Sequence, residues 1–197
     1  MDIKPYEYKQ ESANRILEEV GWKMGNDGVR EKDGKKLVLE ILYNSDSVTE
    51  KNIAELIQAD YKKIGVQINI TGQEEQSYRD NMKSGNFDIV FNINWGMPYD
   101  PQSTLSGMTA PVYGDYAAQQ GLDNKAEIDD AIGKILVSTD EAKRQELYDF
   151  VLTALHEDAV YIPLTYECNK AIYTNKLKGV NFTQTQYEVP FYNMYFE

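Results

Sequence analysis

Residues 36–70 read "KLVLEILYNSDSVTEKNIAELIQADYKKIGVQINI", and this stretch decides the fold. Residues 36–43 and 66–70 are rich in aliphatic side chains, which predicts two strands. Between them, residues 48–65 have the apolar spacing of an amphipathic helix that stops at Gly65. A strand, a crossover helix and a second strand predict a right-handed βαβ unit with parallel strands. The predicted inner face of the helix carries Ile53, Leu56, Ile57 and Ile64.

The segments on either side continue this pattern. Apolar residues at helical spacing predict a helix at 10–21 and a shorter helix at 74–83, and residues 87–95 form a further predicted strand. Two longer helices are predicted at 124–137 and 139–157. Strands that alternate with helices, followed by grouped helices, place the chain in the α/β class, with a mixed sheet flanked by helices.

Three further predictions concern the second half of the chain. Residues 96–122 contain Gly, Pro, Ser, Thr and Tyr without a period, which predicts a long loop. Ser138 and Glu141 stand at the spacing of a capping box and predict the start of the last helix. The apolar runs at 159–166 and 170–175 predict two more strands.

Composition and charge exclude several function classes. The 197 residues carry a net charge of −12, which argues against nucleic acid as a partner and disfavours an anionic membrane surface. The single cysteine, Cys168, rules out an internal disulfide, and we interpret it as a small, half-buried apolar residue. No stretch approaches the ~18 apolar residues of a membrane span. The first residues lack the apolar region of a signal peptide, so we expect either a cytosolic protein or a piece of a longer precursor.

The sequence contains no recognisable catalytic arrangement. The only histidine, His156, lies near the end of a predicted helix, with no GxSxG motif around any serine and no glycine-rich phosphate loop in the chain. Adjacent acids on a helix point in different directions, so Glu74, Glu75, Asp129 and Asp130 are interpreted as solvated surface. We therefore expect a binding protein that is not an enzyme.

An aromatic loop follows the strand predicted at 87–95. Ligands of α/β sheets bind beyond the carboxyl ends of the strands, and Trp95 and Tyr99 stand there. Pro98 and Pro101 stiffen this segment, which lowers the entropy lost when a ligand binds. Rings that carry polar groups stack on a solute and orient it, so both aromatics are predicted ligand contacts. A core position near the surface is the alternative for Trp95.

Three long segments resemble a known family. They are "SANRILEEVGWKMGNDGVREKDGKKLVLEILY" at 12–43, "AELIQADYKKIGVQINI" at 54–70 and "SGNFDIVFNINWGMPYDP" at 84–101. Together they resemble the C-terminal lobe of family 5 extracellular solute-binding proteins, which serve peptide and nickel ABC importers. The likeness is greatest to the nickel-binding members. It implies the type II periplasmic-binding fold, in which two lobes clasp a ligand and deliver it to a membrane permease.

The resemblance implies a domain division, a location and partners. Residues 1–175 would form the α/β lobe, and residues 176–197 a tail that returns toward an N-terminal lobe absent from this chain. The partners would be that lobe, the ABC permease subunits and a small chelate or peptide. The protein would be periplasmic or extracellular, with a lipoprotein anchor as an alternative. It would hold no cofactor, and nickel chelate would be its cargo.

The resemblance also implies a set of ligand contacts. Trp95 and Tyr99 match aromatic residues of the family's cleft. Tyr113 stands where nickel-binding members place a histidine, and a phenol is a poorer nickel ligand than imidazole. Arg79 aligns with a cleft tyrosine, and Tyr187 aligns with a threonine.

These departures bear on the cargo. Arg79 could pair with a carboxylate of the ligand, or it could be a solvated helix arginine. If nickel is carried, we expect it to arrive already chelated, with no metal ligand from the protein. A short peptide is the alternative cargo.

Overall fold

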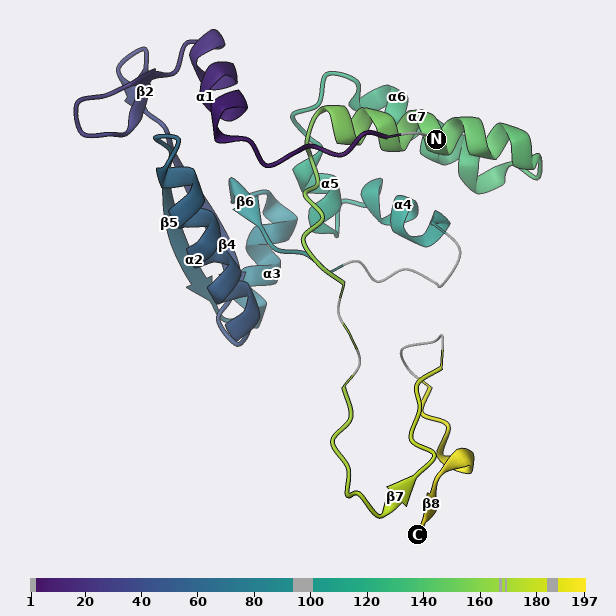
Figure 1. Cartoon of the computed structure of the whole chain (residues 1–197). Coiled ribbons are helices and arrows are strands. Elements are labelled where there is room, and N and C mark those ends of the chain that lie inside the picture. Colours follow the sequence, from purple (N-terminus) through teal and green to yellow (C-terminus); the bar gives the residue numbers. More distant parts are fainter. Residues whose placement is uncertain (1–2, 94–100, 167, 169, 184–187) are drawn as a thin grey trace.

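The computed structural model describes residues 3–93, 101–166, 168, 170–183 and 188–197. Its central sheet has the order β5-β4-β6, and all neighbouring strands are parallel. These strands are β4 (Val38–Asn44), β5 (Gln67–Gln73) and β6 (Ile89–Val90). α2 (Val48–Lys62) crosses between β4 and β5, which confirms the predicted βαβ unit (Figure 1).

The core of this unit lies between α2 and the sheet. Ile41 of β4 and Ala54 of α2 are fully buried, and Ile68 of β5 is 3% exposed. Gln58 adds a hydrogen bond across the layer, from Nε2 to the Ile68 carbonyl at 2.7 Å. The prediction that Leu56 faces inward is wrong, because it is 68% exposed. It stands about 200° around the helix from Ala54, at about 100° per residue.

α3 (Glu75–Ser84) covers another part of the sheet. Tyr78 and Met82 are buried with Leu42 of β4, so the helix packs on the sheet through one narrow stripe. The helix ends at Gly85, which has a φ of 72° and closes the last turn in the left-handed conformation. β6 follows and pairs only through Ile89 and Val90, so the predicted strand at 87–95 is shorter within its described part.

Four helices form a second cluster: α4 (Gln102–Met108), α5 (Gly114–Ala118), α6 (Lys125–Val137) and α7 (Glu141–Glu157). α6 and α7 pack along each other through buried Ile128, Ile132, Val151 and Leu155. The prediction of a period-free loop at 96–122 is wrong for its described part, which holds α4 and α5. Leu105 and Met108 of α4 are buried against α6, so tertiary packing stabilises a helix too short to show a period.

The predicted capping box of α7 is also wrong. Asp140 is the N-cap, and its Oδ1 accepts a hydrogen bond from the Lys143 backbone N–H at 3.1 Å. Ser138 lies two residues earlier, in extended backbone that ends α6. Its hydroxyl accepts from the Asp140 N–H, so it supports the turn between the helices.

The N-terminal part links the two clusters. α1 (Gln10–Glu19) leads into a small antiparallel sheet of β1 (Lys23–Met24), β2 (Arg30–Lys32) and β3 (Lys35–Lys36). The chain before α1 runs across to α7 (Figure 1). There the Tyr6 ring stacks on His156 with 4.6 Å between ring centroids.

The C-terminal part extends away from both clusters (Figure 1). It holds a two-stranded pairing of β7 (Leu177–Lys178) with β8 (Tyr195–Phe196), and a short 3-10 helix, η1 (Phe191–Asn193), precedes β8. The prediction of strands at 159–166 and 170–175 is wrong, because the described residues in these ranges form no strand.

Solvent exposure gives the physical reason. Ile172 is fully exposed and Tyr166 is 95% exposed, so no packing within the described part of the chain stabilises a strand at these residues. Cys168 is exposed as well, which corrects its interpretation as a half-buried residue.

Candidate ligand-binding site

The carboxyl ends of β4 and β5 meet the start of α3 in a polar network. Asn44, the last residue of β4, donates from Nδ2 to the Glu75 carboxylate and from its backbone N–H to Glu50 Oε2, the latter at 2.9 Å. Gln73, the last residue of β5, accepts from Asn81 Nδ2 at 2.7 Å. The edge where a ligand of a parallel sheet is expected is therefore lined with amides and carboxylates.

Arg79 lies one helical turn beyond Glu75. Its Nε donates to Oε1 of Glu75, and the arginine side chain is 62% exposed. A carboxylate of a ligand would have to share this guanidinium with Glu75. Glu75 is thus a structural partner of both Asn44 and Arg79, which corrects its interpretation as plain solvated surface.

Glu74 also has a defined structural role, as the N-cap of α3. Its carboxylate caps α3 by accepting the N–H groups of Gln76 and Ser77 at 3.2 and 3.0 Å. These backbone hydrogen bonds hold the pKa of Glu74 below its usual value. Glu74 is exposed, so its interpretation as solvated surface is confirmed, and the helix cap is an additional role.

Tyr78 fixes the exit of β6 against α3. Its hydroxyl donates to the backbone carbonyl of Phe91, the first residue after β6. Burial raises the pKa of this phenol, and the nearby Glu50 and Glu75 raise it further, so the hydroxyl remains a donor. The start of the predicted aromatic loop is thereby tied to the same helix that carries Arg79.

Tyr113 stands at the start of α5, a helix that contacts α3. It is the N-cap residue of that helix and is 54% exposed. The next residue, Gly114, lies directly on α3, since a Cβ placed there would be 2.9 Å from Met82 Cε. Arg79 is one turn before Met82 on α3. The structure therefore brings Arg79 and Tyr113 onto two helices in contact.

The remaining predicted contacts, Trp95, Tyr99 and Tyr187, lie outside the described residues. Their roles stay predictions. The described chain ends on one side at Ile93 and resumes at Pro101, directly before α4.

Both the sequence and the fold of this chain match a known family. Residues 2–116 match the sequence profile of "Bacterial extracellular solute-binding proteins, family 5 Middle". The chain belongs to family 5 of the bacterial extracellular solute-binding proteins. The expected type II periplasmic-binding fold of the α/β class is confirmed by the structural relatives described next.

Two family 5 relatives from sequence comparison differ in what their names say they bind. The nickel-binding periplasmic protein of Escherichia coli is 38% identical over 193 residues, which are 97% of this chain and 37% of that protein. The oligopeptide-binding protein AppA of Bacillus subtilis is 24% identical and matches 92% of this chain and 34% of that protein. The chain thus spans less than two fifths of the length of each relative.

Two solved structures extend the family 5 likeness. NikA from Brucella suis, in complex with Fe(III)-EDTA, superimposes with a TM-score of 0.91 and 40% identity, over all of this chain and 40% of that one. NikZ from Campylobacter jejuni, in complex with Ni(L-His), gives a TM-score of 0.69 and 25% identity, over 91% of this chain and 36% of that one.

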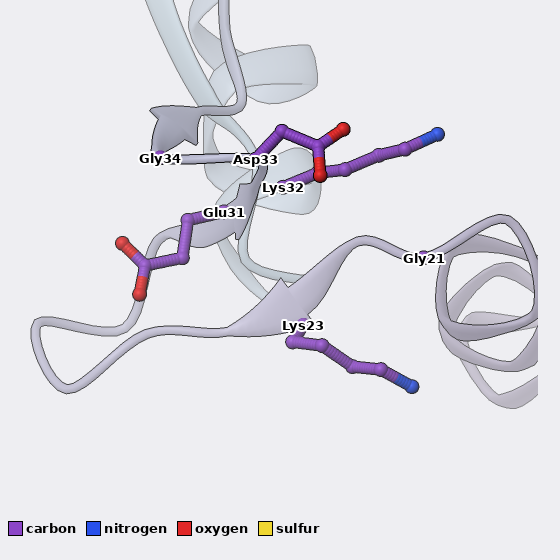
Figure 2. Close-up of a pocket in the computed structure, with 6 residues that line it drawn as sticks. All are labelled: Gly21, Lys23, Glu31, Lys32, Asp33 and Gly34. Carbon is purple, nitrogen blue, oxygen red and sulfur yellow. The ribbon is translucent and has the colours of Figure 1, made fainter.

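Two surface pockets lie elsewhere on this family 5 chain. One is bounded by the small sheet of β1, β2 and β3 and is lined by Gly21, Lys23, Glu31, Lys32, Asp33 and Gly34. Figure 2 shows Glu31 pointing to the opposite side from Lys23 and Lys32, so the charged ends do not converge on a ligand. The other is lined by Lys83, Ser84, Gly85, Pro111, Tyr116, Ala117 and Gln120.

The described part of this family 5 chain holds no group of three or more His, Cys, Asp or Glu side chains that could bind a metal ion. None of its described helices is long and apolar enough to cross a membrane.

Sequence reasoning missed several polar residues of this edge. Asn44 follows a predicted strand directly, so the rule that ligands bind at strand carboxyl ends could have found it. Asn92 and Asp115 form a hydrogen bond across 23 positions of sequence. Without the fold, no local pattern indicates that these two side chains meet.

Proposed function

We propose that this chain forms one lobe of the solute receptor of an ABC importer, and that its cargo is nickel held in a small organic chelate. The observation that carries this proposal is the 38% identity to the nickel-binding periplasmic protein over 97% of this chain. The relative is much longer, so we propose that a second lobe of the same receptor completes the cleft. In this proposal, residues 1–175 form the lobe and residues 176–197 return toward the other one.

The chemistry of the described site supports a chelate over a bare ion. Arg79 presents an exposed guanidinium, which recognises a carboxylate better than a metal cation. Tyr113 presents a phenol, which is a weak ligand for nickel beside imidazole. A chelate brings both the carboxylates and the ligands that the metal requires. We propose that Trp95 and Tyr99 stack on it and that Tyr187 adds a hydroxyl.

Binding of nickel with L-histidine tests the proposal directly. Tryptophan fluorescence of the receptor that contains this chain would be measured during titration with NiCl2 and L-histidine. We expect quenching that falls in Trp95→Phe and is kept in Trp22→Phe, which removes the other tryptophan of this chain. Equal quenching in both variants would show that Trp95 does not face the cargo.

An oligopeptide is the second candidate cargo. The 24% identity to the oligopeptide-binding protein AppA over 92% of this chain favours it, and Arg79 could pair with a peptide carboxylate. Calorimetry with tetra-alanine and with nickel–histidine on one receptor preparation separates the two. If the receptor bound tetra-alanine but not nickel–histidine, the cargo would be a peptide and not a nickel chelate.

The proposal extends to location and partners. We propose that the receptor works in the periplasm or outside the cell and hands its cargo to ABC permease subunits without chemically changing it. A lipoprotein anchor is the alternative to a free periplasmic receptor. Fractionation of the producing cells with an antibody to this chain distinguishes a released receptor from a membrane-anchored one.

A further inference from the structure

A hydrogen bond joins the exit of β6 to α5. Asn92, two residues after β6, donates from Nδ2 to Oδ2 of Asp115 at 3.2 Å. Asp115 lies in the first turn of α5, two residues after Tyr113. The bond therefore connects the strand that leads into the aromatic loop with the helix whose N-cap is Tyr113.

The other end of α5 is fixed by a buried pair. Gln119, the C-cap residue of α5, is fully buried, and its Nε2 donates to the Tyr161 hydroxyl at 2.7 Å. That hydroxyl lies 3.5 Å from the backbone carbonyl of Asp115. Burial raises the pKa of Tyr161, so its phenol stays neutral. The segment that follows α7 passes α5 in Figure 1, and the bond from Gln119 places Tyr161 beside this helix.

α5 needs such support because it has only five residues and no side-chain cap at Tyr113. A helix of this length does not hold its own conformation in water. Packing on Met82 sets its distance from α3, and the Gln119–Tyr161 pair fixes its far end. Among the described residues, the bond from Asn92 to Asp115 is the side-chain link between α5 and the exit of β6.

We propose that Asp115 is a positioning residue for ligand binding: it sets the place of Tyr113 relative to the exit of β6. This inference rests on the proposed function, because the place of Tyr113 affects affinity only if the cargo contacts it. Loss of the acceptor lets the first turn of α5 move, and Tyr113 moves with it. The conservative change to asparagine keeps an acceptor oxygen for Asn92.

The first test needs no ligand. 3-Fluorotyrosine is placed only at position 113 of the full chain, and its fluorine NMR signal is compared among variants. We expect Asp115→Ala to shift or broaden the signal and Asp115→Asn to restore it. Asp123→Ala, which removes an exposed acid from the following turn, should leave it unchanged. Asn92→Ala removes the donor instead and should reproduce the effect of Asp115→Ala.

The second test measures affinity for nickel with L-histidine in the receptor that contains this chain. We expect Asp115→Ala to weaken binding about fivefold, the size of one lost hydrogen bond, and Asp115→Asn to recover most of the loss. An unchanged fluorine signal in both Asp115→Ala and Asn92→Ala would overturn the positioning role.

The two tests separate the two proposals. A shifted fluorine signal with unchanged affinity would overturn the link between Tyr113 and the ligand. If the unsubstituted receptor bound neither nickel–histidine nor tetra-alanine, the proposed function would fail. The fluorine signal would still decide whether Asp115 positions Tyr113.

Discussion

Two regions of the chain are both rich in apolar residues, but only one of them forms a core. Residues 38–84 fold into a parallel strand pair with α2 and α3 packed on it, and Ile41 at its centre is fully buried. Residues 162–175 contain the same kinds of side chain, yet Ile162, Leu164 and Ile172 are exposed. Apolar residues of the first region find partners within about thirty positions of sequence, whereas the described residues 162–166 and 170–175 join no strand and their apolar side chains stay exposed.

The comparison separates what a local pattern determines from what it leaves open. A βαβ unit carries its own strand partner, so its pattern is enough to specify the pairing. A strand without a pairing strand close in sequence needs hydrogen-bond partners for its backbone from a more distant part of the protein. In the second region the partners would come from the other lobe of the proposed receptor.

The largest expected effect comes from matched truncations in the two regions. Ile41→Ala should cost about 2–5 kcal/mol of unfolding free energy, because it leaves a cavity in the core. Ile172→Ala should change the unfolding free energy by less than about 0.5 kcal/mol. Urea denaturation of the chain measures both. Similar losses would contradict the contrast between the regions.

Substitution of Arg30 tests whether the first region also depends on a buried polar side chain that bonds to it. Arg30 is 1% exposed and donates to the Trp22 carbonyl, the Ile64 carbonyl and Asn14 Oδ1 at 2.7, 2.8 and 2.8 Å. Arg30→Met leaves these acceptors without their donor and should cost about 2–3 kcal/mol. The exposed Arg15→Met on α1 is the control. An equally small loss of unfolding free energy in both variants would show that the hydrogen bonds of Arg30 do not stabilise the fold.

Tyr6 tests whether a terminal segment can add to a core. Its ring stacks on His156, and its hydroxyl lies 3.3 Å from the backbone carbonyl oxygens of His156 and Glu157. Tyr6→Ala should cost about 1 kcal/mol of unfolding free energy. Tyr192→Ala, at an 80% exposed residue of the C-terminal part, should cost nothing measurable. The reverse order would show that the C-terminal part carries the stabilising contacts.

The smallest expected effect is a pH dependence at the start of α3. Glu74 has a lowered pKa in the folded chain, so its contribution to stability is present above its usual pKa of 4.5. That contribution is lost as the pH falls through the lower folded value. Glu74→Gln should therefore show a shallower loss of stability on acidification than the unsubstituted chain.

Urea denaturation at steps from about pH 3 to about pH 7 measures this difference. Glu127→Gln, at an exposed glutamate of α6, serves as the control and should follow the unsubstituted chain. Parallel curves for Glu74→Gln and the unsubstituted chain would show that the cap contributes no pH dependence.

Local physics sets how much of the fold the sequence could predict. The elements at 38–73 were predictable because each carries a strong period and its partner is close in sequence. The N-cap at Asp140 and the outward direction of the Leu56 side chain were missed. Each depends on the starting residue or the rotation of a helix, and an error of one residue in either changes the result. α4 was missed because its stability comes from α6 rather than from its own seven residues.

The site was less predictable than the fold. Arg79 and Tyr113 were found through resemblance, and the fold places them on helices in contact. The bond between Asn92 and Asp115 joins residues 23 positions apart, and only the tertiary structure brings them together. Trp95, Tyr99 and Tyr187 remain predictions that ligand binding must test.

Amide hydrogen exchange, measured on this chain and on the receptor that contains it, shows whether this chain is one lobe of a larger receptor. We predict that the amides of β4 and β5 are protected in both, and that amides of residues 162–175 gain protection only in the receptor, where a second lobe covers them. Equal protection of residues 162–175 in both proteins would contradict the proposal that this chain is one lobe of a two-lobed receptor.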